Sequence, residues 1–381
     1  MTSQSFGQCQ VALAYENYCV ADPESLETPA MLLFQELMEH NIRSVCEMVG
    51  GGQNLVVHVK THKCEAVARR QLEHGIDGFK CATLKELEMV LQAGACNAIL
   101  AYPQVQKRKI ERLFDLVARF PDASIAAVVS SPLHVDLLMN AAEQHEQILQ
   151  VMLDLDVGMH RTGIRFGADA TELYRRVNEH PLLRGAGIHW YDGHDHFSDE
   201  TQRRARVEGH IKSVRDYQQQ LESEGLPVPR IVAGGSWSFP YYARAEGMQG
   251  SPGTCIYWDA GYAKDMPDMP FHCAVLILTQ VVDIFPDEGM FTTDLGCKGI
   301  SSDLPEEDRA VLLGYESAKL VLHSEEHGVF RIDGELPEVG DYLLAIPGHI
   351  CPTTIRYPGC HVIDGSGQVT DYFIHTARDR L

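Results

Sequence analysis

Residues 55–64 read Leu-Val-Val-His-Val-Lys-Thr-His-Lys-Cys, a run of β-branched residues that breaks off at a lysine. Residues 65–72 follow with the composition of a helix, so this stretch predicts a strand that passes directly into a helix. Lys60 then lies at the carboxyl end of the strand. In an α/β barrel that end carries the chemistry, so the stretch predicts both a fold and the place of a site.

The same alternation of strand and helix recurs along the chain. Apolar, β-branched runs predict strands at 55–60, 78–82, 98–102, 124–129, 150–155, 187–191, 230–233 and 254–258. Apolar residues spaced three and four apart predict helices between them, at 83–92, 106–118, 134–145, 168–179 and 201–224. Eight such alternations over about 200 residues predict the α/β class and a (β/α)8 barrel.

The pattern changes after residue 265. Strand-like runs then dominate, at 272–283, 289–295, 328–332, 342–346, 361–363 and 372–375, and helical spacing is confined mainly to 306–314. We therefore expect a barrel over residues 28–265 and a β-rich domain over residues 266–381. Residues 1–27 form a separate N-terminal segment. The runs 12–20 and 31–33 are candidates for additional strands of the β-rich domain.

Lys60 is the candidate nucleophile. A lysine at a strand end becomes a reactive amine when its surroundings depress its pKa, and Schiff-base formation with a carbonyl cofactor is the usual reason. The alternative is a solvated lysine at a strand-helix junction. Lys63, at the start of the helix, is the rival candidate, and we expect it to face solvent.

A second chemical signal lies at residues 347–352, which read Pro-Gly-His-Ile-Cys-Pro. On an extended strand, residues i and i+2 project from one face, so His349 and Cys351 could hold one borderline or soft divalent ion. Two protein ligands leave coordination positions open for a substrate. The alternative is a buried cysteine beside a strand-end histidine. Because the pair lies outside the barrel in sequence, it could reach Lys60 only across a domain or subunit interface.

Other strand ends gather glycine and polar residues. Residues 234–238 read Gly-Gly-Ser-Trp-Ser, where backbone N–H groups can bind a phosphate, although Gly-Gly-Ser is also a common turn. Gly253 and Thr254 add an amide and a hydroxyl. Arg161 could contact an electron-poor ring or pair with a nearby aspartate. Residues 191–196 read Tyr-Asp-Gly-His-Asp-His and are dense in acid–base groups.

The amino-acid composition fits an enzyme that acts on small molecules. The 381 residues are 45% hydrophobic and 22% charged, enough for a barrel and a smaller second domain. The net charge of −21 argues against nucleic acid or an anionic membrane as partner. Eleven cysteines without a Cys-x-x-Cys pair predict reduced thiols. Together with an N-terminus unlike a signal peptide, and no apolar run near about 20 residues, they predict a cytoplasmic location.

Nine short motifs then occur in one chain order. They are Thr28-Pro-Ala, His58-Val-Lys-Thr-His-Lys, Cys81-Ala-Thr, Asp156-Val-Gly-Met-His-Arg-Thr-Gly, Tyr191-Asp-Gly-His, Gly234-Gly-Ser, Pro252-Gly-Thr, Glu325-Glu-His-Gly and Pro347-Gly-His-Ile-Cys-Pro-Thr. Taken together, they resemble the D-serine dehydratase and D-threonine aldolase family, which are pyridoxal-phosphate enzymes with the alanine-racemase barrel. Residues 1–27 lie outside this resemblance.

The resemblance implies roles for these residues. Lys60 would carry pyridoxal 5′-phosphate as a Schiff base, Tyr191 would lie beside the cofactor, and His349 and Cys351 would bind a divalent metal. The predicted catalytic residues are Lys60, Tyr191, His194 and His196. The predicted cofactor-binding residues are His58, Lys60, Arg161, Tyr191, Gly234, Gly235, Ser236, Trp237, Gly253 and Thr254.

Two positions depart from the family pattern. Relatives usually continue Gly-Gly-Ser with Thr-Pro-Thr, whereas Trp237, Ser238 and Phe239 follow here. A phosphate contact by the Ser238 hydroxyl stays open, but the wall is bulkier, which leaves the size of the substrate open. Cys255 stands where an aromatic residue is common.

The predicted reaction acts on D-3-hydroxy amino acids. Lys60 removes the Cα proton, the cofactor accepts the resulting charge, and the metal makes the β-hydroxyl a better leaving group, which yields a 2-oxo acid and ammonia. If His194, His196 or metal-bound hydroxide deprotonates the β-hydroxyl instead, an aldolase yields glycine and an aldehyde. In the family, His-x-Cys goes with dehydratases and His-x-Asp with aldolases, so Cys351 favours dehydration. Its thiolate also favours Zn²⁺ over Mn²⁺ or Mg²⁺.

Two further classes stay open at this point. An amino-acid racemase would need a second Cα base opposite Lys60. A non-catalytic carrier of pyridoxal phosphate would need the lysine but not the metal pair. The D-configuration of the substrate and a homodimer are implied by the resemblance alone.

Overall fold

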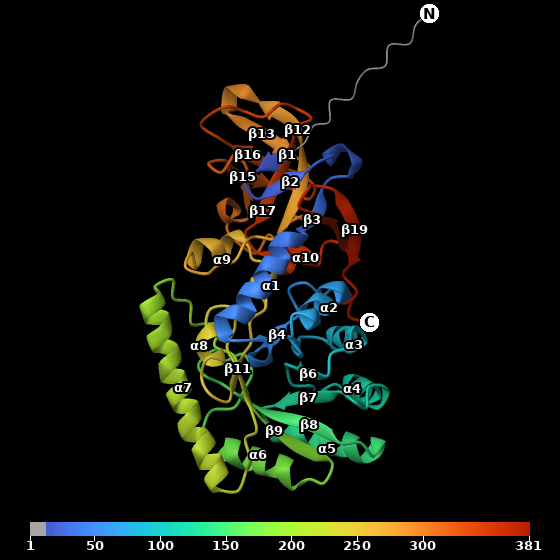
Figure 1. Cartoon of the computed structure of the whole chain (residues 1–381), viewed down its shortest axis with the longest axis vertical. Coiled ribbons are helices and arrows are strands. Elements are labelled where there is room, and N and C mark those ends of the chain that lie inside the picture. Colours follow the sequence, from blue (N-terminus) through green and yellow to red (C-terminus); the bar gives the residue numbers. More distant parts are fainter. Residues whose placement is uncertain (1–12) are drawn as a thin grey trace, which may run out of the picture. The chain divides into compact units, whose positions relative to one another are not determined.

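The computed structural model describes residues 13–381, which form two compact units (Figure 1). The barrel unit comprises residues 42–255, 265–270 and 376–381. The β-rich unit comprises the described residues up to 41, together with 256–264 and 271–375. The described part of the chain therefore begins in the β-rich unit, forms the barrel, and then returns to complete the β-rich unit.

The barrel unit is built on an eight-stranded parallel sheet. Its strands are hydrogen-bonded in chain order: β4 (Val56–His58), β5 (Gly78–Cys81), β6 (Asn97–Leu100), β7 (Ser124–Val129), β8 (Leu149–Leu155), β9 (Leu183–Trp190), β10 (Ile231–Ala233) and β11 (Met248–Gly250). A parallel bridge between Leu55 and Gly250 joins the first strand to the last. The predicted fold class, a (β/α)8 barrel with a β-rich second domain, is confirmed.

Helices alternate with these strands. They are α1 (Gln35–Val49), α2 (Glu65–Glu73), α3 (Leu84–Ala93), α4 (Lys107–Arg119), α5 (Pro132–His145), α6 (Ala168–Glu179), α7 (Glu200–Ser223) and α8 (Phe239–Ala243). α3, α5 and α7 begin directly after Thr83, Ser131 and Asp199, whose side chains accept a backbone N–H of the first turn. These caps fix where the strand-to-helix loops at the barrel mouth end.

The eighth strand lies earlier than predicted. Residues 254–258 were expected to form it, but Thr254–Ile256 is a 3-10 helix and the strand is Met248–Gly250. Residues 254–258 are apolar because they are buried, not because they are extended. The true strand reads Met-Gln-Gly, which carries no strand signal, and Gly250 lies too close to the Phe239 carbonyl for a side chain.

The side chains inside the barrel change from apolar to polar along the barrel axis. Its lower layers are buried and apolar: Val56, Ile99, Ala126, Val128, Met152, Ala186 and Val232. Two residues further along the same strand faces, His58 follows Val56 and Asp154 follows Met152. Lys80 pairs in register with His58 and so faces the same way. The carboxyl end of the barrel therefore closes on a polar layer.

The β-rich unit is organised around β12 (Val275–Phe285). β12 pairs antiparallel with β3 (Ala30–Phe34), β13 (Met290–Thr293) and β17 (Tyr342–Pro347). The remaining strands are β14 (Ala310–Leu312), β15 (Lys319–His323), β16 (Gly328–Arg331), β18 (Gly359–Ile363) and β19 (Val369–Ile374). β3 lies between β12 and β18, and the hairpin of β1 (Leu13–Tyr15) and β2 (Tyr18–Val20) forms a separate small sheet.

One predicted helix of the β-rich unit is wrong. Residues 306–314 form a 3-10 turn at Glu306–Asp308 followed by strand β14. The spacing of apolar residues there resembles a helix, but β14 buries Ala310 and Leu312 at the spacing of a strand. The strand β15 was not predicted.

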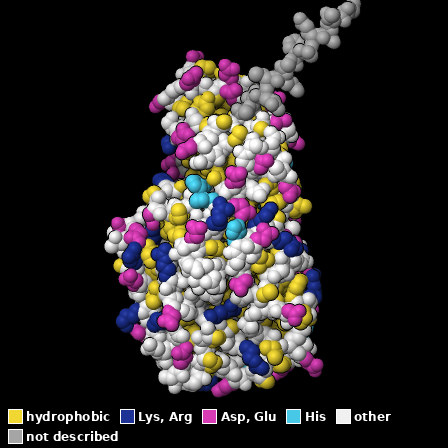
Figure 2. Space-filling view, in the orientation of Figure 1, with side chains coloured by type: hydrophobic (Ala, Val, Ile, Leu, Met, Phe, Trp, Pro, Cys, Tyr) yellow, Lys and Arg dark blue, Asp and Glu magenta, His cyan; other side chains and the backbone are white. Residues whose placement is uncertain are grey.

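The distribution of charged side chains on the surface fits the acidic composition of the chain. On the face shown in Figure 2, acidic side chains are interspersed with Lys and Arg and do not gather into one patch. None of the helices within residues 13–381 has the length and apolar character needed to cross a membrane.

Candidate active site

A pocket of about 260 Å³ lies at the carboxyl end of the barrel strands. It is lined by His58, Lys60, Lys80, Ala82, Ala101, Tyr102, Arg161, Thr162, His189 and Tyr191. The structure thus brings together four residues predicted from sequence, which lie at the ends of two strands, β4 and β9, and in the loop after β8: His58, Lys60, Arg161 and Tyr191. His194 and His196 do not line this pocket.

Tyr191 is the centre of the pocket. The Nζ atoms of Lys60 and Lys80 lie 5.8 Å and 5.6 Å from the centroid of its ring. The guanidinium carbon of Arg161 lies 4.7 Å from the same centroid. These are cation–π distances, so one phenol ring is surrounded by three cationic side chains.

His58 lies beside this cluster as a neutral base. The backbone N–H of Lys60 donates to its Nδ1 at 3.3 Å. Burial lowers the pKa of His58 well below its ordinary value, and the charges of Lys60 and Lys80 lower it further. A neutral imidazole therefore adds no further positive charge to the pocket.

The guanidinium of Arg161 is available to bind a ligand in the pocket. The alternative expected from sequence, an ion pair with Asp154 or Asp156, is not formed among the described residues. Asp156 instead binds the His160 ring at 2.7 Å, and Asp154 binds the His189 ring at 2.7 Å.

His189 and Asp154 form a pair that sequence analysis missed. Both are buried, and Asp154 also accepts the hydroxyl of Thr162 at 2.9 Å. Because Asp154 holds Nδ1 of His189, the Nε2 atom is left for another partner. That buried Nε2 has no hydrogen-bond partner within residues 13–381. A buried polar atom of this kind marks a place for a ligand.

Lys80 is the second missed residue. Its side chain is 2% exposed, and it forms no hydrogen bond or ion pair within the described part of the chain. Burial lowers the pKa of Lys80 to about 7, and the charges of Lys60 and Arg161 lower it while those of Asp154 and Asp192 oppose the shift. A lysine inside the apolar strand Gly-Phe-Lys-Cys was the available sequence signal.

The predicted phosphate segments meet beside the pocket. The Ser236 hydroxyl accepts the backbone N–H of Thr254 at 3.2 Å, which joins residues 234–237 to residues 253–254. A Cβ atom on Gly235 would lie 2.8 Å from the Tyr191 ring. Glycine therefore lets the backbone approach the ring. The Gly235 and Thr254 N–H groups donate to the hydroxyls of Ser238 and Ser236, so a phosphate bound in this glycine cradle would replace these internal contacts.

The departure at residues 237–238 has a structural explanation. Trp237 stacks on His196, with ring centroids 4.9 Å apart and planes 16° apart. The Ser238 hydroxyl donates to the buried Asp192 at 2.8 Å and accepts the Gly235 N–H at 3.2 Å. Ser238 thus shapes the glycine turn from inside, and its hydroxyl is committed to that role.

His194 and Lys63 have other partners. His194 lies 3.5 Å from Asp195, at the edge of an ion-pair cluster. Lys63 was expected to face solvent, but its side chain is only 13% exposed because it pairs with the fully buried Glu86. Glu86 also accepts the Ala82 N–H at 2.5 Å, so Lys63 secures the start of α3.

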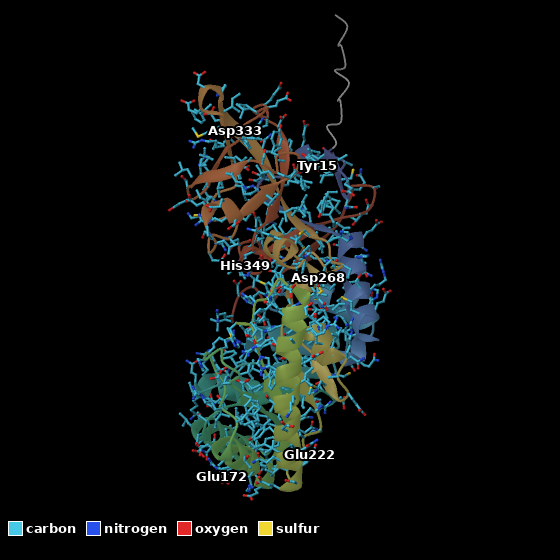
Figure 3. The ribbon with its side chains drawn as sticks, turned by 90° about the vertical axis from the view of Figure 1, so that its left-hand side faces the viewer. Tyr15, Glu172, Glu222, Asp268, Asp333 and His349 are labelled. Atoms are coloured by element: carbon cyan, nitrogen blue, oxygen red, sulfur yellow. The ribbon has the colours of Figure 1, made fainter. Side chains whose placement is uncertain are left out.

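The predicted metal pair lies at the start of a helix, not on a strand. Its His349 lies in the β-rich unit (Figure 3). β17 ends at Pro347, His349 precedes α10 (Ile350–Thr354), and Cys351 lies in its first turn. Burial lowers the pKa of His349, but hydrogen bonds with Cys351 and Asp303 outweigh this effect and raise it to about 9. The imidazole and the thiol are therefore within hydrogen-bonding reach although the backbone between them is not extended.

Asp303 is a third missed residue. Its Oδ2 lies 2.6 Å from Nδ1 of His349, so it fixes the orientation of the imidazole. The buried Asp259 accepts the Ile350 N–H at 3.0 Å and holds the start of α10. No group of three or more metal-binding side chains occurs within residues 13–381. A nitrogen and a sulfur donor with an orienting carboxylate fit an open Zn²⁺ site.

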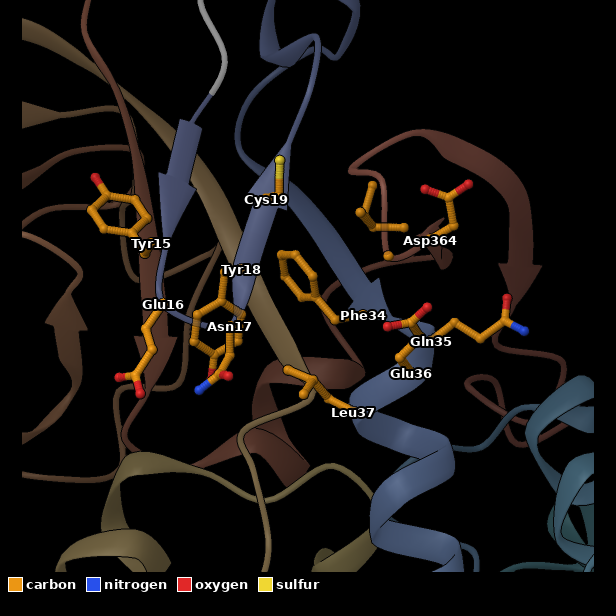
Figure 4. Close-up of a pocket in the computed structure, with 12 residues that line it drawn as sticks. Tyr15, Glu16, Asn17, Tyr18, Cys19, Phe34, Gln35, Glu36, Leu37 and Asp364 are labelled. Atoms are coloured by element: carbon orange, nitrogen blue, oxygen red, sulfur yellow. The ribbon is translucent and has the colours of Figure 1, made fainter.

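A further cavity in the β-rich unit lies apart from these residues. It measures about 300 Å³ and lies beside β1, β2 and the start of α1 (Figure 4). Glu16, Glu36 and Asp364 line it together with Tyr15 and Tyr18. None of the predicted site residues belongs to this cavity.

Comparisons with known proteins agree with this geometry. A family model described as the alanine racemase N-terminal domain matches residues 35–260. The chain belongs to this family. A second model, described as a putative serine dehydratase domain, matches residues 274–363 of this alanine-racemase-family chain.

Relatives of known activity extend over most of the chain. The 3-hydroxy-D-aspartate aldolase of Paracoccus denitrificans (strain Pd 1222) is 26% identical over 87% of each chain. The D-threo-3-hydroxyaspartate dehydratase of Delftia sp. (strain HT23) is 24% identical over 91% of this chain and 96% of its own. The solved D-threonine aldolase of Filomicrobium marinum superposes with a TM-score of 0.84 at 26% identity, over 93% and 96%. The family predicted from the motifs, pyridoxal-phosphate-dependent lyases of the alanine-racemase fold, is confirmed.

Proposed function

We propose that this protein is a divalent-metal-activated, pyridoxal-phosphate-dependent lyase of D-3-hydroxy amino acids, and that it acts as a dehydratase. The observation that carries the proposal is the barrel pocket, where Lys60 and Arg161 face one tyrosine ring beside a glycine cradle. Pyridoxal phosphate needs three kinds of group: an amine that bonds to its aldehyde, cations near its acidic groups, and amide N–H groups that bind its phosphate.

The described residues fit the cofactor. Lys60 would hold its aldehyde carbon, Gly235, Ser236 and Thr254 would hold its phosphate, and the unpartnered Nε2 of His189 offers one more polar contact. Gly234, Trp237 and Gly253 complete the cradle. When bound, pyridoxal phosphate withdraws electrons from Cα of an amino acid.

Residues of the barrel supply the proton chemistry. The free amine of Lys60 removes the Cα proton. Arg161 and the neutral His58 orient the ligand, and the ring of Tyr191 covers it and limits access of water. His194 and His196 line no part of the pocket, so their proposed role is confined to the alternative aldolase reaction.

His349 and Cys351 would hold the metal. A Zn²⁺ ion at this place would supply a Lewis acid for the β-hydroxyl. The thiol is the softer donor, which favours Zn²⁺ over Mn²⁺ or Mg²⁺. The homodimer and the cytoplasmic location expected from sequence stay predictions.

Replacing Asp303 by asparagine is expected to weaken Zn²⁺ binding about 10- to 100-fold, because the imidazole of His349 loses the carboxylate that orients it. Calorimetric titration of the metal-free protein with Zn²⁺ measures this. Asp287→Asn, an exposed aspartate of the same unit, is the matched control. Equal Zn²⁺ affinity of the Asp303 variant and the control would refute the orienting role.

A D-threonine-aldolase-type reaction is the second candidate. It is favoured by the relatives, since a 3-hydroxy-D-aspartate aldolase and a D-threonine aldolase are both 26% identical to this chain. The two reactions differ in the bond that breaks, which is C–O in a dehydratase and Cα–Cβ in an aldolase.

The products separate the two reactions. With D-serine, D-threonine and D-3-hydroxyaspartate as substrates, we expect 2-oxo acids and ammonia to accumulate and glycine to stay at background. The L-enantiomers serve as the control for configuration. Accumulation of glycine with an aldehyde would assign the aldolase reaction instead.

A further inference from the structure

The barrel pocket holds more positive charge than the described residues balance. Lys60, Lys80 and Arg161 line it, and no carboxylate does. Lys80 is the most deeply buried of the three, at 2% exposure. Apart from the Tyr191 ring, Lys80 has no hydrogen bond or ion pair among the described residues. A buried ammonium that no carboxylate balances is costly, so an anionic partner from outside the chain is the physical expectation.

The carboxylates nearest to Lys80 are already engaged. Asp154 is bound by His189 at 2.7 Å and by Thr162 at 2.9 Å. Asp192 accepts hydroxyls from Ser238 and Tyr242, both at 2.8 Å. The other groups that act on Lys80 are cationic, since the charges of Lys60 and Arg161 both repel its ammonium.

The large apolar side chains of strand β5 lie on the face opposite to Lys80. These side chains, Phe79 and Cys81, are buried. Lys80 lies in register with His58 on one side and Ile99 on the other, where the apolar interior ends. An uncharged side chain of similar length would fill the same space.

We propose that Lys80 is a positioning residue that binds an anionic oxygen of the molecule held at the barrel mouth. This inference rests on the proposed function. Once Lys60 forms a bond to the cofactor, Lys80 and Arg161 remain as two cations. The complex offers two anionic oxygen groups besides the phosphate, namely the ring oxygen of the cofactor and the carboxylate of the amino acid.

The test uses the whole protein loaded with pyridoxal phosphate. Lys80→Met removes the charge at similar length, Lys80→Arg retains it, and Lys80→Gln is a second neutral variant. Lys107→Met, whose side chain is 82% exposed, is the matched control. The absorption band of the bound cofactor, at about 410–430 nm, is titrated with pH, first alone and then with D-alanine, which has a carboxylate but no β-hydroxyl.

Each source of the anionic oxygen gives its own result. If Lys80 binds the ring oxygen, the midpoint of the pH titration without D-alanine shifts by about one pH unit or more in Lys80→Met and Lys80→Gln. If Lys80 binds the carboxylate, that midpoint stays, and half-saturation requires roughly 10- to 100-fold more D-alanine. Lys80→Arg keeps the charge, so its titration midpoint and its half-saturation by D-alanine are expected to lie close to those of the wild-type protein.

Two further results would overturn claims at different levels. Neutral variants that match Lys107→Met in both titrations would remove the role of Lys80 and leave the proposed function intact. A wild-type protein that takes up no pyridoxal phosphate would overturn the proposed function itself, and the role of Lys80 with it.

Discussion

Replacing Lys60 by alanine is expected to abolish the absorption band of bound pyridoxal phosphate at about 410–430 nm and to lower turnover about 100- to 10,000-fold. The physical reason is that one amine has two tasks in the proposed reaction, in which Lys60 would both hold the aldehyde carbon and remove the Cα proton. Absorption spectra of the purified variant, together with the rate of 2-oxo acid release from D-serine, measure both effects.

The control for Lys60 is a lysine of the same unit outside the pocket. Lys107→Ala should keep both the band and the rate, since its exposed ammonium pairs with Glu111 at 3.8 Å, away from the pocket. Reduction of the loaded wild-type protein with borohydride, followed by peptide mapping, should find the cofactor on Lys60. Recovery of the label on Lys80 or Lys63 would contradict the assignment.

Replacing Cys351 by alanine is expected to leave the absorption band in place and to reduce turnover of D-serine roughly 100-fold or more. The residue lies outside the barrel unit, so the cofactor residues are unchanged, whereas a Lewis acid contributes several kcal/mol and about 1.4 kcal/mol corresponds to a factor of ten. Chelation of the wild-type protein should produce the same loss, and added Zn²⁺ should reverse it only when Cys351 is present.

Cys297→Ala is the matched control for this prediction. Cys297 lies in the same β-rich unit, is half-buried and lies outside the predicted metal pair, so its removal should change neither the band nor the response to chelation. Full activity of Cys351→Ala in metal-free buffer would remove the metal from the proposed reaction and favour a racemase or another metal-independent activity.

Periodic elements were predictable from the sequence. α6 begins and ends where the apolar spacing predicts, at Ala168 and Glu179. Six of the barrel helices and seven of the eight strands follow from local patterns, because a helix buried on one face leaves a period of apolar residues and a strand buried on both faces leaves a continuous apolar run. β11 was missed because Met-Gln-Gly has no apolar period and is paired only by tertiary contacts.

The candidate site was partly predictable. The motif at residues 58–60 located the pocket, since a strand that ends in a lysine is a local signal. The role of Asp303 could not be predicted from a local motif, because its contact with His349 joins residues 46 positions apart. The extended backbone expected at His349 and Cys351 was wrong, because strand β17 ends at Pro347 and helix α10 begins at Ile350.

Lys80 was missed for a different reason. A single lysine in a short apolar strand is usually at a strand end, with its ammonium in solvent. Only the closed barrel shows that this strand face points toward the axis, and that the ammonium is buried among other cations. Charge balance inside a cavity is a property of the assembled fold and leaves no local period.

The position of β3 has a consequence for synthesis of the protein. This strand, Ala30–Phe34, is buried along its whole length between β12 and β18. During translation, β3 is synthesised before the barrel, whereas its partners β12 and β18 are synthesised only after the entire barrel. The nascent chain therefore carries the apolar segment Ala-Met-Leu-Leu-Phe without its two sheet partners throughout most of elongation, and we expect this segment to be prone to aggregation until both partners are made.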